Sequence, residues 1–185
     1  MYHHGNGVRK DLRKALEWYL AAAQAGDSVA QSNLALMYYR GSGTARDYGL
    51  AAKWFRAAAE QGDARARHGL GFLYIKGWGV PTDYSEAARS ERLAAEDGIP
   101  QAQADLAYLY ESRRGVPLDY VAAYGWYSRA IAGGDKTSAE RRKNLSRIMT
   151  KRQLDAANAV LRPESSKPQR RSTPATAAFA LLENH

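Results

Sequence analysis

The chain has 185 residues, no cysteine and a formal net charge of +8. This length allows one ordinary domain with a tail, and the absence of cysteine excludes disulfides, thiolate nucleophiles and cysteine-ligated metal centres. No apolar run approaches the roughly 20 residues of a membrane-spanning helix, and the first residues lack the apolar core of a signal peptide. Basic residues outnumber acidic ones by 16 to 15 over 1–135 and by 11 to 4 over 136–185. A nearly neutral body therefore precedes a basic C-terminal part.

A period of 36 residues runs through the first 135 positions. Seven columns place the same residue type 36 positions apart in three or four successive copies. Periods of about 20 to 50 residues are typical of repeat architectures. The columns are Tyr2, Tyr38, Tyr74 and Tyr110; Gly7, Gly43, Gly79 and Gly115; Asp11, Asp47, Asp83 and Asp119; Ala15, Ala51, Ala87 and Ala123; Ala22, Ala58, Ala94 and Ala130; Gly26, Gly62, Gly98 and Gly134; and Leu34, Leu70 and Leu106.

Each copy predicts two helices. In the copy at 28–63, apolar side chains recur from Ala30 at i, i+4, i+7 and i+8, which is one stripe of a helix. Gly41 stands where a helix C-terminus favours a left-handed residue. Asp47 is a good N-cap for a second helix, which we expect to end near Gln61. The array is therefore expected to consist of helix pairs.

These residues carry a family resemblance. The repeated pattern, A-x3-L-A/G-x2-Y-x2-G-x-G-V-x2-D-x3-A-x2-W-Y/F-x2-A-A-x2-G, resembles the SEL-one-like repeat (SLR), a relative of the tetratricopeptide repeat. The resemblance implies an all-α fold, a right-handed α-solenoid of antiparallel helix pairs. It also implies a scaffold or adaptor for protein partners, often in bacterial signalling, envelope or host-interaction settings, with no catalytic residue and no cofactor. The pattern spans 30–62, 66–98 and 102–134, within an SLR array at 1–135 that divides into a partial repeat, 1–27, and full repeats, 28–63, 64–99 and 100–135.

Three departures from the pattern have structural consequences. The chain starts at the equivalent of Met37, so the first helix of copy one is missing and Trp18 is expected to be exposed. We interpret this as a fragment of a longer protein, or as a chain that associates end to end. Ser90 and Glu91 replace an aromatic pair, which predicts looser packing or a bend. Arg113 replaces the first loop glycine of copy four.

After residue 135 the period stops. Thr137-x-x-Glu140 and Thr150-x-x-Gln153 match capping boxes and predict two helices that cap the array over 136–161. Residues 162–185 combine prolines, Ser/Thr and scattered charges, which predicts a disordered tail.

Catalysis finds little support in the sequence. The histidines are His3, His4, His68 and His185, and none has a carboxylate at the sequence spacing of a metal site. His3 and His4 together could bind a metal adventitiously, but a solvated turn is the preferred interpretation. No nucleophile elbow or phosphate-binding loop is present. We therefore expect no catalytic residue, no resident metal and no small-molecule substrate.

A binding surface can be placed by helix geometry. First helices usually line the concave face of such solenoids, and their outward positions vary between copies. Two interpretations stay open: these residues contact a peptide or helix with some acidic residues, or the apolar ones bridge adjacent repeats. The residues are Asn33, Leu36, Tyr39, Arg40, Phe72, Ile75, Lys76, Asp105, Tyr108 and Glu111.

The basic segment after the array also has two interpretations. It forms a solvated capping face, or it binds an anionic partner such as nucleic acid, lipid headgroups or an acidic protein. Nucleic-acid binding usually adds stacking aromatics, and residues 136–161 contain none, so a protein or peptide is the expected partner. The segment consists of Lys136, Arg141, Arg142, Lys143, Arg147, Lys151 and Arg152.

Overall fold

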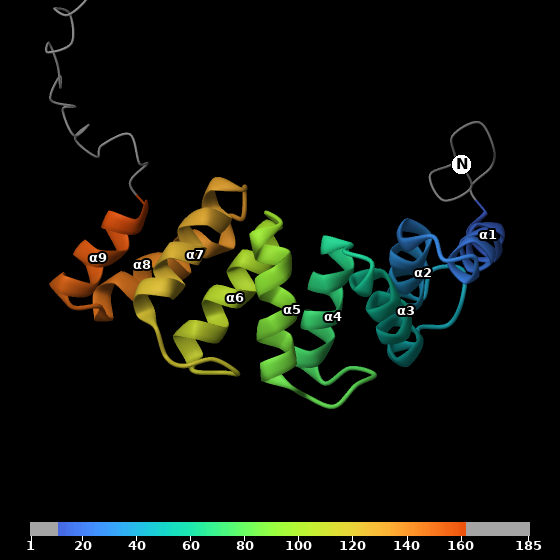
Figure 1. Ribbon diagram of the computed structural model, residues 1–185, viewed down its shortest axis with the longest axis horizontal. Coiled ribbons are helices and arrows are strands. Elements are labelled where there is room, and N and C mark those ends of the chain that lie inside the picture. The colour runs from blue at the N-terminus through green and yellow to red at the C-terminus, as the bar shows by residue number, and fades with distance from the viewer. Residues whose placement is uncertain (1–10, 162–185) are drawn as a thin grey trace, which may run out of the picture.

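The computed structural model describes residues 11–161, which form nine helices and no strand in one continuous row (Figure 1). The expected tail at 162–185 lies outside the described residues. The helices are α1 Leu12–Gln24, α2 Ser28–Arg40, α3 Tyr48–Glu60, α4 Ala64–Lys76, α5 Tyr84–Glu96, α6 Pro100–Ser112, α7 Tyr120–Ala132, α8 Thr137–Ile148 and α9 Lys151–Leu161. Each helix from α1 to α7 packs against the next one along the chain, so the described part is an all-α solenoid, as predicted.

Helix ends follow the repeated residues. The carboxylate of Asp47 accepts the Leu50 N–H at 2.8 Å and so begins α3, as predicted. The aspartates of the same column cap α1, α5 and α7. Gly41 ends α2 with φ 71, in the left-handed region predicted for it. These local signals fix where each helix pair turns.

The second loop glycine of each repeat is required by a close approach. Gly79 has φ 70, and a β-carbon there would overlap the backbone of Tyr48 at the start of α3. Gly43 and Gly115 approach Leu12 and Tyr84 in the same way, one repeat earlier and one later. Only glycine combines the left-handed backbone with the missing side chain. The glycine column therefore holds each loop against the preceding repeat.

Small residues bring the helices together. Ala51, Ala58 and Ala66 are fully buried in one core cluster. Trp54 lies at the edge of this cluster and also contacts the cluster of Ala23, Ala30 and Leu34, which joins α1 to α2. Alanine thus sets the close helix packing, while the large ring fills the space between repeats.

Both ends of the described array differ from its middle. Trp18 on α1 is 67% exposed, which confirms the expected exposure; end-to-end association stays a prediction. Helices α8 and α9 both pack on α7, where Leu145 and Ala157 share a core cluster with Tyr127. Ile148, in contrast, is 60% exposed.

The second predicted capping box is confirmed. Thr150 N–H donates to Gln153 Oε1 at 2.9 Å, and Gln153 N–H donates back to Thr150 Oγ1 at 3.3 Å. The two residues therefore begin α9 reciprocally.

The first predicted capping box is wrong. Asp135 accepts the Ser138 N–H at 2.9 Å, and the hydroxyls of Thr137 and Ser138 donate to the same carboxylate. Glu140 instead pairs with Lys143 at 3.8 Å. Helix α8 already begins at Thr137, and the Thr137 hydroxyl donates to Asp135 in place of capping the amide of residue 140. Among residues 11–161, no helix is long and apolar enough to cross a membrane.

Candidate functional site

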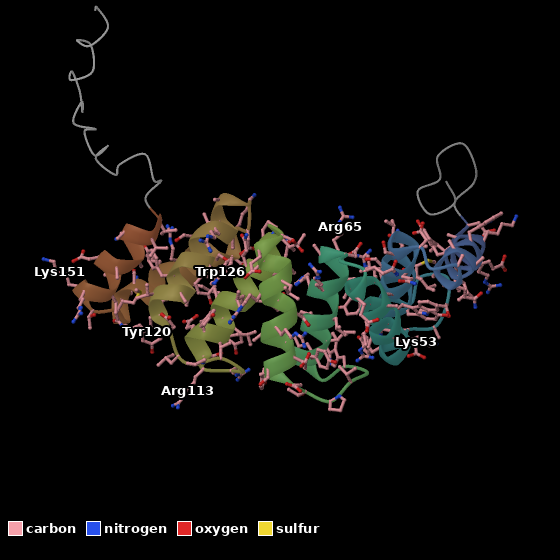
Figure 2. The ribbon with its side chains drawn as sticks, viewed as in Figure 1. Lys53, Arg65, Arg113, Tyr120, Trp126 and Lys151 are labelled. Atoms are coloured by element: carbon pink, nitrogen blue, oxygen red, sulfur yellow. The ribbon has the colours of Figure 1, made fainter. Side chains whose placement is uncertain are left out.

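A groove opens between the first helices of two successive repeats. It has a volume of about 390 Å³, and we call it the α2–α4 groove. Its walls are mainly apolar, and Arg65 stands exposed at its edge, on the side of the array opposite Arg113 (Figure 2). The lining residues are Ser32, Leu36, Tyr39, Phe55, Arg65, His68, Gly69, Phe72, Ile99 and Gln101.

The groove exists because position 69 lacks a side chain. The ring of Phe55 lies directly against Gly69, and a β-carbon there would stand 2.7 Å from Phe55 Cζ. Phe55 is 2% exposed, so it forms the floor and not the rim. Any larger residue at 69 would displace this ring or fill the groove.

An aromatic cluster adjoins the groove at the C-terminal ends of α2 and α4. The ring of Tyr39 meets that of Phe72 edge-on at 6.3 Å between centroids. Trp78 stacks on Tyr48 at 4.9 Å and meets Phe72 at 5.8 Å. Lys76 Nζ lies 5.4 Å from the Phe72 centroid. Aromatic pairs of this kind add about 0.5–1.5 kcal/mol each beyond area burial, so this wall is well ordered.

The predicted concave-face residues of α2 and α4 do not all line one cavity. Leu36, Tyr39 and Phe72 line the α2–α4 groove. Asn33 and Arg40 instead line a smaller cavity of about 210 Å³, which Leu36 also borders.

Two other predicted residues of this face hold the array together. Ile75 packs against a buried cluster that contains Ala87 and Leu109. Glu111 accepts the hydroxyl of Tyr127 at 2.7 Å. Burial, together with this bond, raises the pKa of Tyr127. Both interactions join neighbouring helices, so these two side chains contribute to packing and lie outside the groove.

The residues of the basic segment also have different surroundings. Arg141 Cζ lies 5.3 Å from the Tyr108 centroid, and Arg142 donates to Ser128 Oγ at 3.1 Å. These two arginines therefore bind the array. Arg147 contacts Asn144 at 3.0 Å on its own helix. The other four are exposed, Lys151 at the far end of the row (Figure 2): Lys136, Lys143, Lys151 and Arg152.

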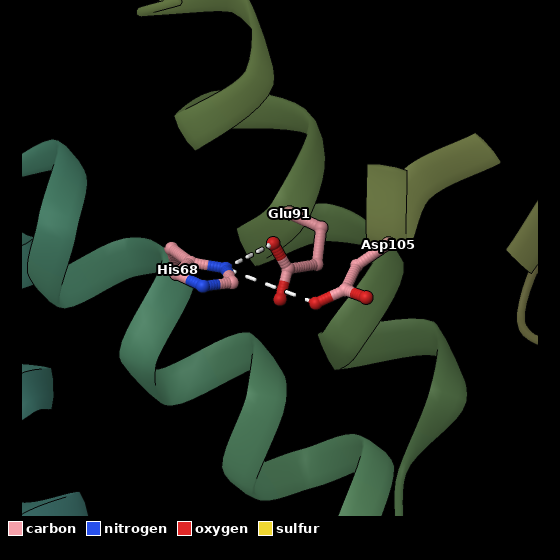
Figure 3. A group of neighbouring side chains, drawn as sticks. All are labelled: His68, Glu91 and Asp105. Carbon is pink, nitrogen blue, oxygen red and sulfur yellow. Dashed lines mark hydrogen bonds and ion pairs between the residues drawn. The ribbon is translucent and has the colours of Figure 1, made fainter. Parts of the chain in front are cut away.

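Three ionisable side chains meet beside the groove, and sequence reasoning did not find them as a group. His68 from α4, Glu91 from α5 and Asp105 from α6 converge with the Glu91 carboxyl between the other two (Figure 3). His68 Nδ1 is 2.9 Å from Glu91 Oε2 and 4.0 Å from Asp105 Oδ2. The side chain of Glu91 is 0% exposed, and those of His68 and Asp105 are 25% and 34% exposed. We call these residues the His68 cluster.

The electrostatics of the His68 cluster favour uncharged forms. Burial, and after it the charge of Asp105, raises the pKa of Glu91 well above its usual value. Burial also raises the pKa of Asp105, although His68 opposes this shift. Burial lowers the pKa of His68 despite the nearby Asp105. Removing these groups from water penalises each charged form, and two carboxyls side by side repel each other when ionised.

One sequence signal pointed to this cluster. Glu91 occupies the column that holds Tyr19, Phe55 and Tyr127 in the other copies. The expectation there was looser packing or a bend, and the structure buries the Glu91 carboxyl completely. His68 lies on the first helix of the same repeat and Asp105 on the first helix of the next one, so no local spacing links the three residues.

The fold and its repeated contacts define a helical repeat solenoid, and comparison with known proteins identifies its family. The Sel1 repeat matches residues 1–27, 28–63, 64–89 and 100–135. The chain therefore belongs to the Sel1 repeat family, which confirms the resemblance to SLR proteins. Proteins of this family are generally protein–protein interaction scaffolds. Residues 90–99, which include Glu91, fall outside the matched segments.

Solved structures show the same fold. A Sel1 repeat protein from Oxalobacter formigenes is 41% identical with a TM-score of 0.69, over 75% of this chain and 56% of that chain. The protein c5321, a protective antigen of uropathogenic Escherichia coli strains with an SLR fold, is 34% identical with a TM-score of 0.79, over 86% of this chain and 34% of that one. Helicobacter pylori cysteine rich protein B (hcpB) is 21% identical with a TM-score of 0.56, over 71% of this chain and 94% of that chain. A likeness at this low identity shows the fold alone. The comparison with curated proteins found no match.

Proposed function

We propose that this chain is a non-enzymatic scaffold or adaptor that binds a peptide or a helix of a protein partner in the α2–α4 groove. The observation that carries this proposal is the groove itself, with an apolar floor open to solvent beside an ordered aromatic wall. Aromatic and arginine side chains anchor protein interfaces, and both border this groove. The first helices α2 and α4 would thus form the binding part of the concave face.

The lining of the groove indicates the chemistry of the partner. Leu36 and Phe72 would accept apolar side chains spaced along an extended or helical segment. Arg65 and Lys76 are exposed beside the groove and would attract acidic residues flanking that segment. The mechanism is geometric, because stacked helix pairs hold the contact residues at fixed positions.

The groove offers little for catalysis, in keeping with a binding role. The serine that lines it, Ser32, donates its hydroxyl to Asp63 Oδ1 at 3.4 Å and makes no hydrogen bond to His68. His68 is instead engaged with Glu91. A nucleophile needs its base within hydrogen-bond reach, and these contacts separate the two candidates. The bacterial signalling, envelope or host-interaction setting expected from the family belongs to the same proposal.

Site-specific photo-crosslinking tests the proposal. A benzoyl-phenylalanine placed at Leu36 should crosslink a protein partner from the source lysate at high salt. The same group placed at Arg89, which is exposed on α5, serves as the matched control. The variant Phe72→Asp should lose the crosslink at 36 while circular dichroism stays helical. Equal crosslinking at both positions, or crosslinking that Phe72→Asp leaves intact, would contradict a groove-bound partner.

A second candidate function is the binding of an anionic partner through the basic segment. It rests on the exposure of Lys136, Lys143, Lys151 and Arg152. Affinity for heparin or single-stranded DNA should then fall steeply with salt, because neutralised charges release counterions. Charge reversal at these four positions should abolish it. Affinity that survives that reversal would exclude this candidate.

A further inference from the structure

Three side chains of metal-ligand type converge where the Sel1 pattern is interrupted. One potential ligand atom from each of His68, Glu91 and Asp105 lies within 4.8 Å of the others. The three come from α4, α5 and α6, so the stacking of helices brings them together (Figure 3). We propose that the His68 cluster binds one zinc ion, with His68 Nδ1 and a carboxylate oxygen each from Glu91 and Asp105 as ligands.

The distances suit one small divalent cation. Zinc bonds to imidazole nitrogen and carboxylate oxygen measure about 2.0–2.2 Å, so ligand atoms around one ion stand roughly 3–4 Å apart. The observed separations of 2.9 Å from Nδ1 to Glu91 Oε2 and 4.0 Å to Asp105 Oδ2 span this range. Imidazole combined with carboxylates favours zinc over magnesium, which prefers oxygen ligands alone. His68 and Asp105 are partly exposed and leave a path for the ion.

A second observation supports cation binding by the cluster. Glu91 Oε1 is buried and has no hydrogen-bond partner within the part of the chain that the structure describes. A buried carboxylate oxygen without a partner is costly. The hydrogen bond to His68 satisfies only the other oxygen, Oε2. The unsatisfied oxygen therefore leaves coordination capacity inside the cluster.

The surrounding sequence makes room for this carboxyl. A β-carbon at Gly71 would lie 2.6 Å from Glu91 Oε1, whereas the equivalent residues of the other copies are Ala35 and Ala107. An aromatic residue in place of Glu91 would only pack, as Phe55 does. Two carboxyls beside one imidazole would gain from a positive ion that offsets their charge. The raised pKa values of Glu91 and Asp105 reflect the same uncompensated burial.

The test uses the full chain with His3, His4 and His185 replaced by Ala, so that His68 is the remaining histidine. After removal of metal with EDTA and dialysis, calorimetric titration with zinc chloride should give one ion per chain. Glu91→Gln and Asp105→Asn should each weaken binding at least tenfold, since even lost outer contacts cost about 10- to 100-fold. Glu96→Gln, on an exposed carboxylate of the same helix, should leave the affinity unchanged. Absence of binding, or equal affinity in Glu91→Gln, would overturn the proposal.

A second measurement covers the case in which a ligand variant fails to fold. In the chain whose other three histidines are replaced by Ala, one equivalent of zinc should shift the imidazole NMR signals of His68. It should also raise the midpoint of thermal unfolding. The variant Gly71→Ala keeps all three ligands but crowds Glu91 Oε1, so it should weaken zinc binding. An unshifted His68 signal at saturating zinc would refute the site. These readouts are independent of any protein partner, so the zinc site and the proposed scaffold function can fail separately.

Discussion

The ring of Phe55 occupies the space that a side chain at Gly69 would need, because a β-carbon there would stand 2.7 Å from Phe55 Cζ. The two residues lie 14 positions apart, on the second helix of one repeat and the first helix of the next. Shifting both by 36 gives Glu91 and Asp105, which meet in the His68 cluster. The same place in the solenoid therefore holds an apolar contact in one repeat and two carboxyls in the next.

This contact predicts the effect of Gly69→Ala. The added methyl group must displace the buried ring of Phe55, and overpacking of this kind typically costs about 1–3 kcal/mol. The matched control is Gly125→Ala on α7, where nothing lies within 4 Å of the new β-carbon. That control should gain up to about 1 kcal/mol from helix propensity. Urea denaturation would compare the two midpoints, and a Gly69→Ala midpoint at or above wild type would contradict the assigned packing.

The loop glycines allow a second comparison. Gly79 and Gly98 both have positive φ, 70 and 85, but only Gly79 approaches another backbone, that of Tyr48. Gly98→Ala should cost about 1–2 kcal/mol, the usual penalty of a left-handed non-glycine residue. Gly79→Ala should cost more, because the loop must also move away from α3. Similar thermal midpoints for the two variants would show that the close approach at Gly79 contributes nothing.

Arg113 predicts a gain in stability. It is the one non-glycine residue with positive φ in the described chain, at 57. Arg113→Gly restores the residue of the other copies and should raise the free energy of unfolding by about 1 kcal/mol, the lower end of the left-handed penalty. Arg114→Gly is the control and should destabilise, because Arg114 donates to Tyr84 Oη at 3.2 Å. A lower denaturation midpoint for Arg113→Gly would show that its side chain has a role of its own.

Sequence reasoning correctly predicted the features that depend on residues close together in the chain. The Asp47 cap, the left-handed Gly41 and the Thr150–Gln153 box each depend on residues a few positions apart, and each is confirmed. The column period indicated a repeat architecture, and the resemblance to SLR proteins implied the solenoid of helix pairs.

The contacts between repeats were harder to predict. The separation of Arg141 from the rest of the basic segment depends on Tyr108 of α6, and the His68 cluster depends on three helices. A helical face can be read from periodicity, but the partner that it meets is set by the stacking. The Thr137–Glu140 box failed for a local reason, since Asp135 accepts both the Thr137 hydroxyl and the Ser138 amide at the start of α8.

Asp135 gives the last prediction, a pH dependence at the start of α8. Although burial opposes it, the hydrogen bonds from Ser138 and Thr137 lower the pKa of Asp135 below its ordinary value. A carboxyl with a lowered folded-state pKa contributes stability that is present above the unfolded pKa, about 3.9, and is lost as pH falls through the folded value. Asp135→Asn should therefore speed hydrogen exchange of the first α8 amides at pH 6, by the equivalent of about 0.5–1 kcal/mol for a weakened cap. The difference from wild type should vanish in strong acid, where the Asp135 side chain of the wild type is also neutral.

The control is Asp155→Asn on α9. Asp155 is an exposed carboxylate, and its replacement should leave the exchange of these amides unchanged. A wild-type advantage that persists at the lowest pH would mean that the charge of Asp135 does not hold the helix end.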